Sequence, residues 1–260
     1  MVQDETYPIT EMPLPRIRAA GVERPWTWLA AGWEDLWRTP GVSLAYGAII
    51  TALSFALTAG LYWANAFFLL LPLAAGFMLM APILAVGLYE ISRRHETNEP
   101  VTITTALFGF GRHGAQLAGM GVVLMIFLLA WMRLATLIFA LFFVGDAPPW
   151  ESFIATVFFS IESIPFLIVG TAIGAVVAFF VFAISAVSIP MILDRDTNAI
   201  IAVLASLTAV RYNLKAMLVW ASLIVLFTTA GLVTGFLGLV ITLPLIGHAT
   251  WHAYKDLIQH

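Results

Sequence analysis

The sequence has no cysteine and very little charge. Without cysteine, the chain has no disulfides, thiolate nucleophiles, cysteine-ligated zinc or iron–sulfur clusters. Only 10% of the 260 residues are charged, whereas a soluble domain carries about 25% because its surface must stay hydrated. The formal net charge of −3 argues against a nucleic-acid partner, for which a basic excess is typical. A soluble domain is therefore not expected.

Hydrophobic residues make up 61% of the chain and form long apolar runs. In hydrocarbon every backbone amide must bond internally, so runs of about 20 apolar residues predict spanning helices. The predicted fold class is an all-α membrane protein. A polar cytoplasmic segment over 1–32, without a secretory signal peptide, precedes a single transmembrane domain over 33–260. The six predicted transmembrane helices lie at about 41–63, 66–90, 116–144, 165–193, 216–231 and 234–254.

The final apolar stretch, 216–246, is long for one helix and short for two. Gly231, Gly235 and Gly238 lie in its middle, where a tight turn suits glycine, so two closely turned helices are predicted. With six helices and a cytoplasmic N-terminus, eleven of the twelve Lys and Arg residues fall on the cytoplasmic side. This positive-inside asymmetry predicts that both ends are cytoplasmic, in a multi-pass protein of the bacterial inner membrane.

The six helices are predicted to form three hairpins, each preceded by a short segment of aromatic, basic and small residues. These segments lie at 33–38, 108–113 and 210–215. Their composition suits short interfacial helices, with aromatic rings at headgroup depth and cations toward anionic lipid. Any membrane protein places such residues at its cytoplasmic rim, so a true threefold repeat and ordinary rim composition are both open interpretations.

Arg133 is the one basic residue inside a predicted span. An arginine at a helix centre costs at least about 2.5 kcal/mol on insertion scales, so it normally faces protein or water. Acidic groups of the predicted outer loop, Asp146, Glu151 and Glu162, are its candidate partners. One interpretation is contact with an anion, a lipid phosphate or a partner subunit. The other is snorkelling to the outer headgroups or an internal ion pair.

His248 and His252 are four residues apart and share a helical face, from which two imidazoles could reach a metal ion. A zinc-protease motif needs a glutamate beside the first histidine, and Ala249 stands there. Two ligands are too few for a closed metal or haem site unless His95 or His113 joins them.

The same segment also has a structural interpretation, because Trp251 flanks the histidines as in an aromatic belt at the inner membrane interface. No phosphate-binding glycine loop and no nucleophile elbow occurs in the sequence. The acidic residues Glu90, Glu162 and Asp194 lie at span ends, which weakens a proton-driven pump but not a facilitator. We predict no catalytic residues, no cofactor and no enzymatic activity.

Residues 243–257, LPLIGHATWHAYKDL, are similar to the closing signature of a family of bacterial integral membrane proteins, domain of unknown function 2189. Residues 82–94, PILAVGLYEISRR, resemble the ending of the family's second helix, and the resemblance extends across most of the chain from about Trp33. The family has no established activity. Some members are labelled cytochrome c oxidase subunit, so the resemblance implies at most a link to respiratory membranes. A catalytic oxidase needs several intramembrane histidines, which the five histidines here do not supply.

These observations favour a non-enzymatic inner-membrane protein that acts as an accessory or assembly subunit of a larger, respiratory complex. Its expected partners are the lipid bilayer and other membrane subunits. The alternative is a small-molecule or lipid transporter or facilitator, with Arg133 and kinked helices lining a path. A cavity that reaches Arg133 would favour this alternative. An enzyme centred on His248 and His252 is the third hypothesis.

Overall fold

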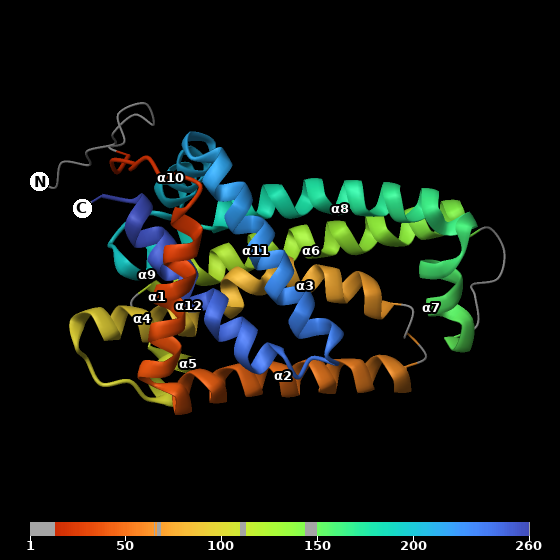
Figure 1. The fold of residues 1–260 in the computed structure, drawn as a ribbon, viewed down its shortest axis with the longest axis horizontal. Coiled ribbons are helices and arrows are strands. Elements are labelled where there is room, and N and C mark those ends of the chain that lie inside the picture. Colours follow the sequence, from red (N-terminus) through yellow and green to blue (C-terminus); the bar gives the residue numbers. More distant parts are fainter. Residues whose placement is uncertain (1–13, 65, 67–68, 110–112, 144–149, 260) are drawn as a thin grey trace, which may run out of the picture.

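In the computed structural model the chain is built from α-helices, most of them side by side along one axis (Figure 1). The structure describes residues 14–64, 66, 69–109, 113–143 and 150–259. Its helices are α1 (Arg24–Arg38), α2 (Pro40–Trp63), α3 (Leu70–Leu84), α4 (Val86–Thr97), α5 (Ile103–Phe108), α6 (Gly114–Phe142), α7 (Trp150–Phe159), the 3-10 turn η4 (Ile161–Ser163), α8 (Ile164–Ser185), α9 (Ser188–Asp194), α10 (Ala199–Tyr212), α11 (Leu214–Val233) and α12 (Leu239–Leu257). Of the predicted segments, residues 1–13, part of the second interfacial segment at 110–112 and most of the outer loop at 144–149 lie outside the described residues.

Five helical stretches are long and apolar enough to cross a membrane. They are Pro40–Trp63, Leu70–Thr97, Gly114–Phe142, Ile161–Asp194 and Leu214–Val233. These stretches agree with the first five predicted helices and confirm an all-α, multi-pass protein. The fourth stretch is interrupted between α8 and α9 at Ala186. Pro190 explains the interruption, because a proline ring clashes with the carbonyl four residues before it.

The last apolar stretch folds as two helices, α11 and α12, which pack against each other as predicted. The turn between them covers 234–238, where Gly235 and Phe236 have φ angles of 63° and 68°. Glycine adopts this left-handed conformation freely, whereas other residues rarely do. The turn falls short of the outer ends of α2 and α8 (Figure 1). Because α12 is not among the five candidate spans, its crossing of the membrane stays a prediction.

The packing partners differ from the predicted succession of three hairpins. α2 packs chiefly against α12 rather than against α3, whereas α3 packs against α6 and α6 against α8. The close approach of α2 to α12 depends on Gly47, because a Cβ at this position would overlap the backbone carbonyl of Val240. The first predicted hairpin is therefore not a packed pair, since the helix that covers α2 comes from the far end of the chain.

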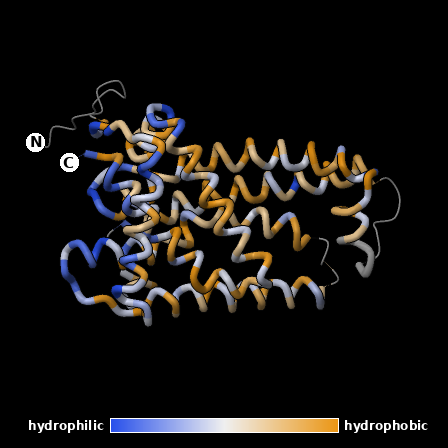
Figure 2. Tube along the Cα trace, viewed as in Figure 1, coloured by the Kyte–Doolittle hydropathy of each residue, from blue (hydrophilic) through white to orange (hydrophobic). Residues whose placement is uncertain are grey.

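Hydrophilic residues gather at one end of the molecule, together with α1, α4, α5, α9, α10 and both ends of the described chain (Figure 2). We call this the polar end. There α1 runs across the long axis of α2, α6 and α8 (Figure 1). Its outer face carries the exposed Trp26, Trp33 and Trp37, and its inner face buries Trp28 and Leu36. This arrangement agrees with an interfacial helix. That the polar end faces the cytoplasm stays a prediction.

Candidate functional site

The second half of α12 runs through the polar end, in contact with α1, α2, α4 and α9. Small residues make this packing possible. A Cβ on Gly32 of α1 would stand 2.6 Å from the backbone nitrogen of Ala249, and one on Gly47 of α2 would overlap the carbonyl of Val240. Because no side chain separates these backbones, His248 is enclosed between α12 and its neighbours and is fully buried.

Asp35 is the centre of a buried polar cluster at this end. Its carboxylate accepts hydrogen bonds from two imidazoles, His95 Nδ1 of α4 at 2.9 Å and His252 Nε2 of α12 at 2.8 Å. Asp35 is 7% exposed and His95 is 5% exposed. One carboxylate of α1 thus joins α4 to α12.

Hydroxyl groups complete the cluster. Thr39 Oγ1 lies 3.1 Å from His95 Nε2. Ser43 Oγ lies 3.0 Å from His248 Nε2, and Ser92 Oγ lies 2.8 Å from His248 Nδ1. The rings of His95 and His248 are stacked, with centroids 6.4 Å apart. The polar-end network consists of Asp35, Thr39, Ser43, Ser92, His95, His248 and His252.

An ionised Asp35 accounts for these contacts. Burial raises the pKa of Asp35. The hydrogen bonds from His252, His95 and Ser92 together lower the pKa by more than burial raises it, so that the pKa lies below its ordinary value. His95 Nδ1 then donates to the carboxylate, while His95 Nε2 lies within hydrogen-bond distance of the Thr39 hydroxyl. A buried carboxylate is costly unless it is paired and fully hydrogen-bonded, and the network provides that compensation.

The hydrogen-bonded chain from Thr39 through His95 to Asp35 resembles a catalytic triad of nucleophile, base and orienting carboxylate. A catalytic site also needs room for a substrate beside the nucleophile. The network members are buried or half-buried, and none of them lines the cavity described below. The network therefore has a structural role: its hydrogen bonds connect α1, α2, α4 and α12.

The predicted metal pair is divided between two sets of hydrogen bonds. His248 contacts two serines, whereas His252 bonds Asp35. His95 does join them, as the metal hypothesis required, but through Asp35, and His113 lies apart at the start of α6. Among the residues described, no group of three His, Asp or Glu side chains could hold a metal ion.

Trp251 is buried in the protein, which corrects its interpretation as part of an aromatic belt. It is fully buried, and its indole N–H donates to Glu96 of α4 at 2.9 Å. One turn later, Tyr254 and Lys255 donate to Asp194 of α9 at 2.7 and 3.3 Å. The belt interpretation fails because α12 is surrounded by α1, α4 and α9 at this level, so its aromatic residues face protein rather than lipid.

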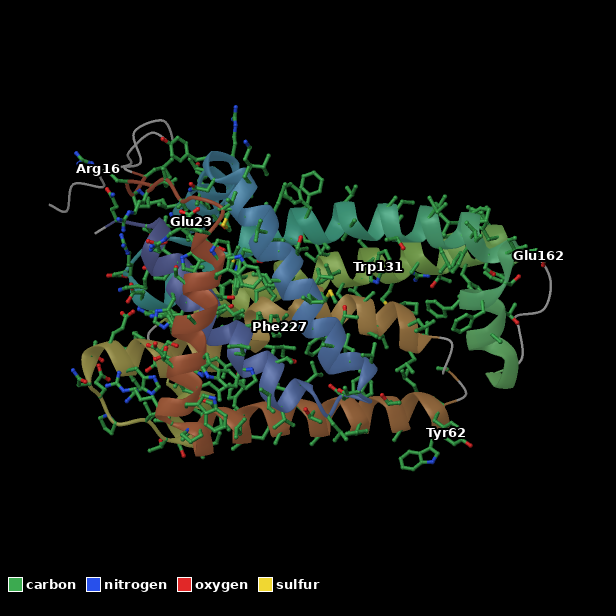
Figure 3. All side chains as sticks on the ribbon, in the orientation of Figure 1. Arg16, Glu23, Tyr62, Trp131, Glu162 and Phe227 are labelled. Atoms are coloured by element: carbon green, nitrogen blue, oxygen red, sulfur yellow. The ribbon has the colours of Figure 1, made fainter. Side chains whose placement is uncertain are left out.

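Arg133 lies on the exposed side of α6, and Glu162 is exposed in η4 at the end opposite Arg16 (Figure 3). Within the described part of the chain, Arg133 makes no hydrogen bond or ion pair, and Glu162 is not its partner. Its other candidate partners, Asp146 and the side chain of Glu151, lie outside the described residues. An exposed arginine that pairs with none of the described residues agrees with a headgroup or anion contact.

A cavity of about 630 Å³ opens between α3, α8, α11 and α12. Its lining is mostly apolar and includes Phe77 of α3, Phe182 of α8, Val225 of α11 and Leu243 of α12. The space exists because α8 packs against α6 and α10, whereas α11 packs against α12. Arg133 does not line this cavity, and the surrounding helices are strongly hydrophobic (Figure 2).

Three residues of the network, Asp35, Ser43 and Ser92, were not predicted from the sequence, and neither was the cavity. A signal for Asp35 was present. The positions that α1 buries include Trp28, Gly32, Asp35 and Leu36, at helical spacing, so Asp35 lies on the apolar face. A charged residue on such a face needs a buried partner. The serines gave no comparable signal, because a serine within an apolar helix commonly bonds its own backbone.

A family model matches the middle part of the chain. Residues 70–194 match the model of a family described as predicted integral membrane protein, domain of unknown function 2189. The match includes 82–94, where the resemblance was expected, whereas 243–257 lies outside it. The label of cytochrome c oxidase subunit is not confirmed. Neither a curated protein nor a solved structure matches the chain.

Proposed function

We propose that this protein, whose residues 70–194 match the domain of unknown function 2189 family of predicted integral membrane proteins, is non-enzymatic and binds an apolar molecule of lipid size. The cavity between α3, α8, α11 and α12 carries this proposal. Its volume of about 630 Å³ falls within the range of about 300–1,000 Å³ that is typical of ligand pockets. Three of the helices that form its walls, α3, α8 and α11, belong to candidate membrane spans. In a membrane the abundant apolar molecules are lipids.

A lipid transporter or facilitator needs a site that binds lipid. The cavity can serve as this site without Arg133, which does not line it. A path through the centre of the bundle would require polar groups or water along its length. The cavity instead offers apolar side chains to its occupant, with hydroxyls such as those of Ser185 and Thr250 already donating to backbone carbonyls. An acyl chain, which needs no hydrogen bonds, matches this lining.

Filling the cavity tests the proposal. Ala178 of α8 and Ala221 of α11 line opposite walls, so we expect Ala221→Trp, and separately Ala178→Trp, to lower the amount of co-purifying lipid about tenfold. Overpacking by an indole costs about 1–3 kcal/mol, of which 1.4 kcal/mol is a tenfold change in affinity. The measurement is native mass spectrometry of the protein released from lipid nanodiscs.

The matched control is Ala230→Trp, because Ala230 is exposed on α11 and does not line the cavity. This variant should retain the lipid of the natural protein. Equal lipid retention in all three monodisperse variants would show that the cavity is not the binding site.

An accessory or assembly subunit of a larger inner-membrane complex is the second candidate. The respiratory association rests only on the oxidase label that some members of the resembling family carry. A shallow depression along α8 favours this candidate, because small residues let a partner helix approach closely. The depression is lined by Leu167, Ile168, Thr171, Ala172 and Ala175, and Ala175 also borders the cavity. Purification from native membranes should then yield stoichiometric partner subunits by mass spectrometry. A protein that purifies alone, under conditions that keep known complexes intact, would contradict this candidate.

A further inference from the structure

The face of α11 that borders the cavity continues toward the polar end as far as a lysine. Ser222 and Thr229 line the cavity and are one heptad apart, and Leu218 lines it one turn earlier. Lys215 is one heptad before Ser222, so it lies on the same helical face. It therefore lies one turn beyond the apolar lining, on the side of the cavity toward the polar end, and this side is called the mouth.

The side chain of Lys215 is free to meet a ligand. It is exposed, and no ion pair joins it to another described residue. Lys255, by contrast, is held by Glu96 and Asp194 at 3.3 Å each. Other cations at the polar end are engaged in the same way, such as Arg94 with the buried Glu90.

This segment of the chain carries charge of one sign. Between Asp196 and Asp256 there is no Asp or Glu, while Arg211, at the end of α10 and four residues before Lys215, is also exposed. A molecule at this mouth therefore meets two cations outside and an apolar cavity inside. An amphipathic anion has the complementary arrangement.

We propose that the ligand of the cavity is a lipid with an anionic, phosphate-bearing headgroup. This inference rests on the proposed function and names the class of its ligand. The acyl chain fills the cavity, and the phosphate remains at the mouth, where Lys215 binds it with Arg211 beside it. Phosphate attracts ammonium and guanidinium groups through charge-assisted hydrogen bonds. Each cation near an anionic surface contributes about a fivefold gain in affinity.

The test compares lipids in one nanodisc. The natural protein is reconstituted in equal parts of phosphatidylcholine and phosphatidylglycerol, and its retained lipids are identified by native mass spectrometry. We expect phosphatidylglycerol to be enriched about fivefold or more among the bound molecules. Lys215→Ala should reduce that enrichment about fivefold, whereas Lys215→Arg should keep it.

Arg16→Ala is the matched control. Arg16 is an exposed cation of the polar end, labelled in Figure 3, and it lies on a segment that does not line the cavity. Its removal should leave the enrichment unchanged. An equal loss in Arg16→Ala and Lys215→Ala would show that only net charge matters, and would overturn the assignment to Lys215.

Different outcomes would contradict lipid binding in the cavity and the anionic headgroup of the bound lipid. If Ala221→Trp displaces the bound lipid but phosphatidylglycerol is not enriched, the cavity binds lipid and the headgroup assignment is wrong. If Ala221→Trp displaces nothing, the cavity is not the site and both proposals fall. A protein helix crosslinked within the cavity would likewise overturn both, in favour of a partner subunit.

Discussion

Neutralising Asp35 leaves two imidazole N–H groups facing a single acceptor oxygen and an amide donor. Because hydrogen bonds to a charged group contribute about 1.5–3 kcal/mol, we expect Asp35→Asn to lower the free energy of unfolding by about 2–3 kcal/mol. For a chain of this size the thermal midpoint should fall by about 4–12 °C. Thermal unfolding in detergent, followed by loss of the monodisperse chromatographic peak, measures the change.

The control for this substitution is Glu34→Gln, in the adjacent residue of α1. Glu34 is exposed, so its charge is solvated by water and its removal should shift the midpoint by little. If both variants unfolded at the temperature of the natural protein, the polar-end network would contribute no stability.

Individual residues show where sequence reasoning reaches its limit. The shared helical face of His248 and His252 was correctly predicted from their spacing, but their partners come from α1, α2 and α4. Those partners could not be identified, because a spacing of four defines direction on one helix and nothing about the helix opposite. Trp251 was misplaced for the same reason: composition alone does not distinguish a tryptophan at a lipid interface from one enclosed by other helices.

A glycine fixes how closely α2 and α12 approach. In Gly47→Ala the new Cβ would overlap the carbonyl of Val240, and a backbone atom cannot rotate away. The helices must separate, so we expect a loss of about 1–3 kcal/mol in stability. Thermal unfolding in detergent again gives the measurement.

The same substitution elsewhere in α2 should act in the opposite direction. A Cβ on Gly60 would meet nothing within 4 Å. Gly60→Ala should therefore stabilise the protein by a few tenths of a kcal/mol up to about 1 kcal/mol, since alanine loses less backbone entropy in a helix. Equal effects of the two substitutions would contradict the close approach at Gly47.

Helix existence could be predicted well, whereas helix pairing could not. Apolar length predicted the spans because the bilayer imposes a minimum length, and the glycines of 231–238 indicated a real turn, with Gly235 at φ 63°. Order along the chain, however, suggested that α2 pairs with α3. The observed pairing of α2 with α12 depends on Gly47, a contact between residues nearly 200 positions apart that no local pattern encodes.

The orientation of the entire fold can be tested with engineered cysteines, because the natural chain has none. Tyr62 is 64% exposed in the last turn of α2, at the end opposite Arg16 (Figure 3), and Asp196 is exposed at the polar end. If the polar end is cytoplasmic, a membrane-impermeant maleimide added to intact cells should label Tyr62→Cys but not Asp196→Cys. Permeabilised cells should label both.

The opposite labelling pattern would reverse the predicted topology. The prediction rests on eleven of twelve basic residues lying on one side, which is a statistical rule about insertion. The structure adds that hydrophilic residues collect at the same end (Figure 2). The cavity, by contrast, could not be predicted, because it is the space left where α8 and α11 diverge, and that space depends on all the pairings at once.

The first and last of the described helices, α1 and α12, are joined at the polar end. Arg18 donates its backbone N–H to Leu257 at 2.9 Å, Gln259 donates to Arg16 at 3.0 Å, and α1 packs along α12. During synthesis α1 leaves the ribosome long before α12 exists. Until α12 is made, Asp35 lacks both His252, which donates a hydrogen bond to it, and the helix that covers it. A chain interrupted before α12 would keep all five candidate spans but would lack the contacts of α12 with α1 and Asp35. Closure of the fold thus requires α12, and copies without α12 carry an uncovered carboxylate by which they differ from folded ones.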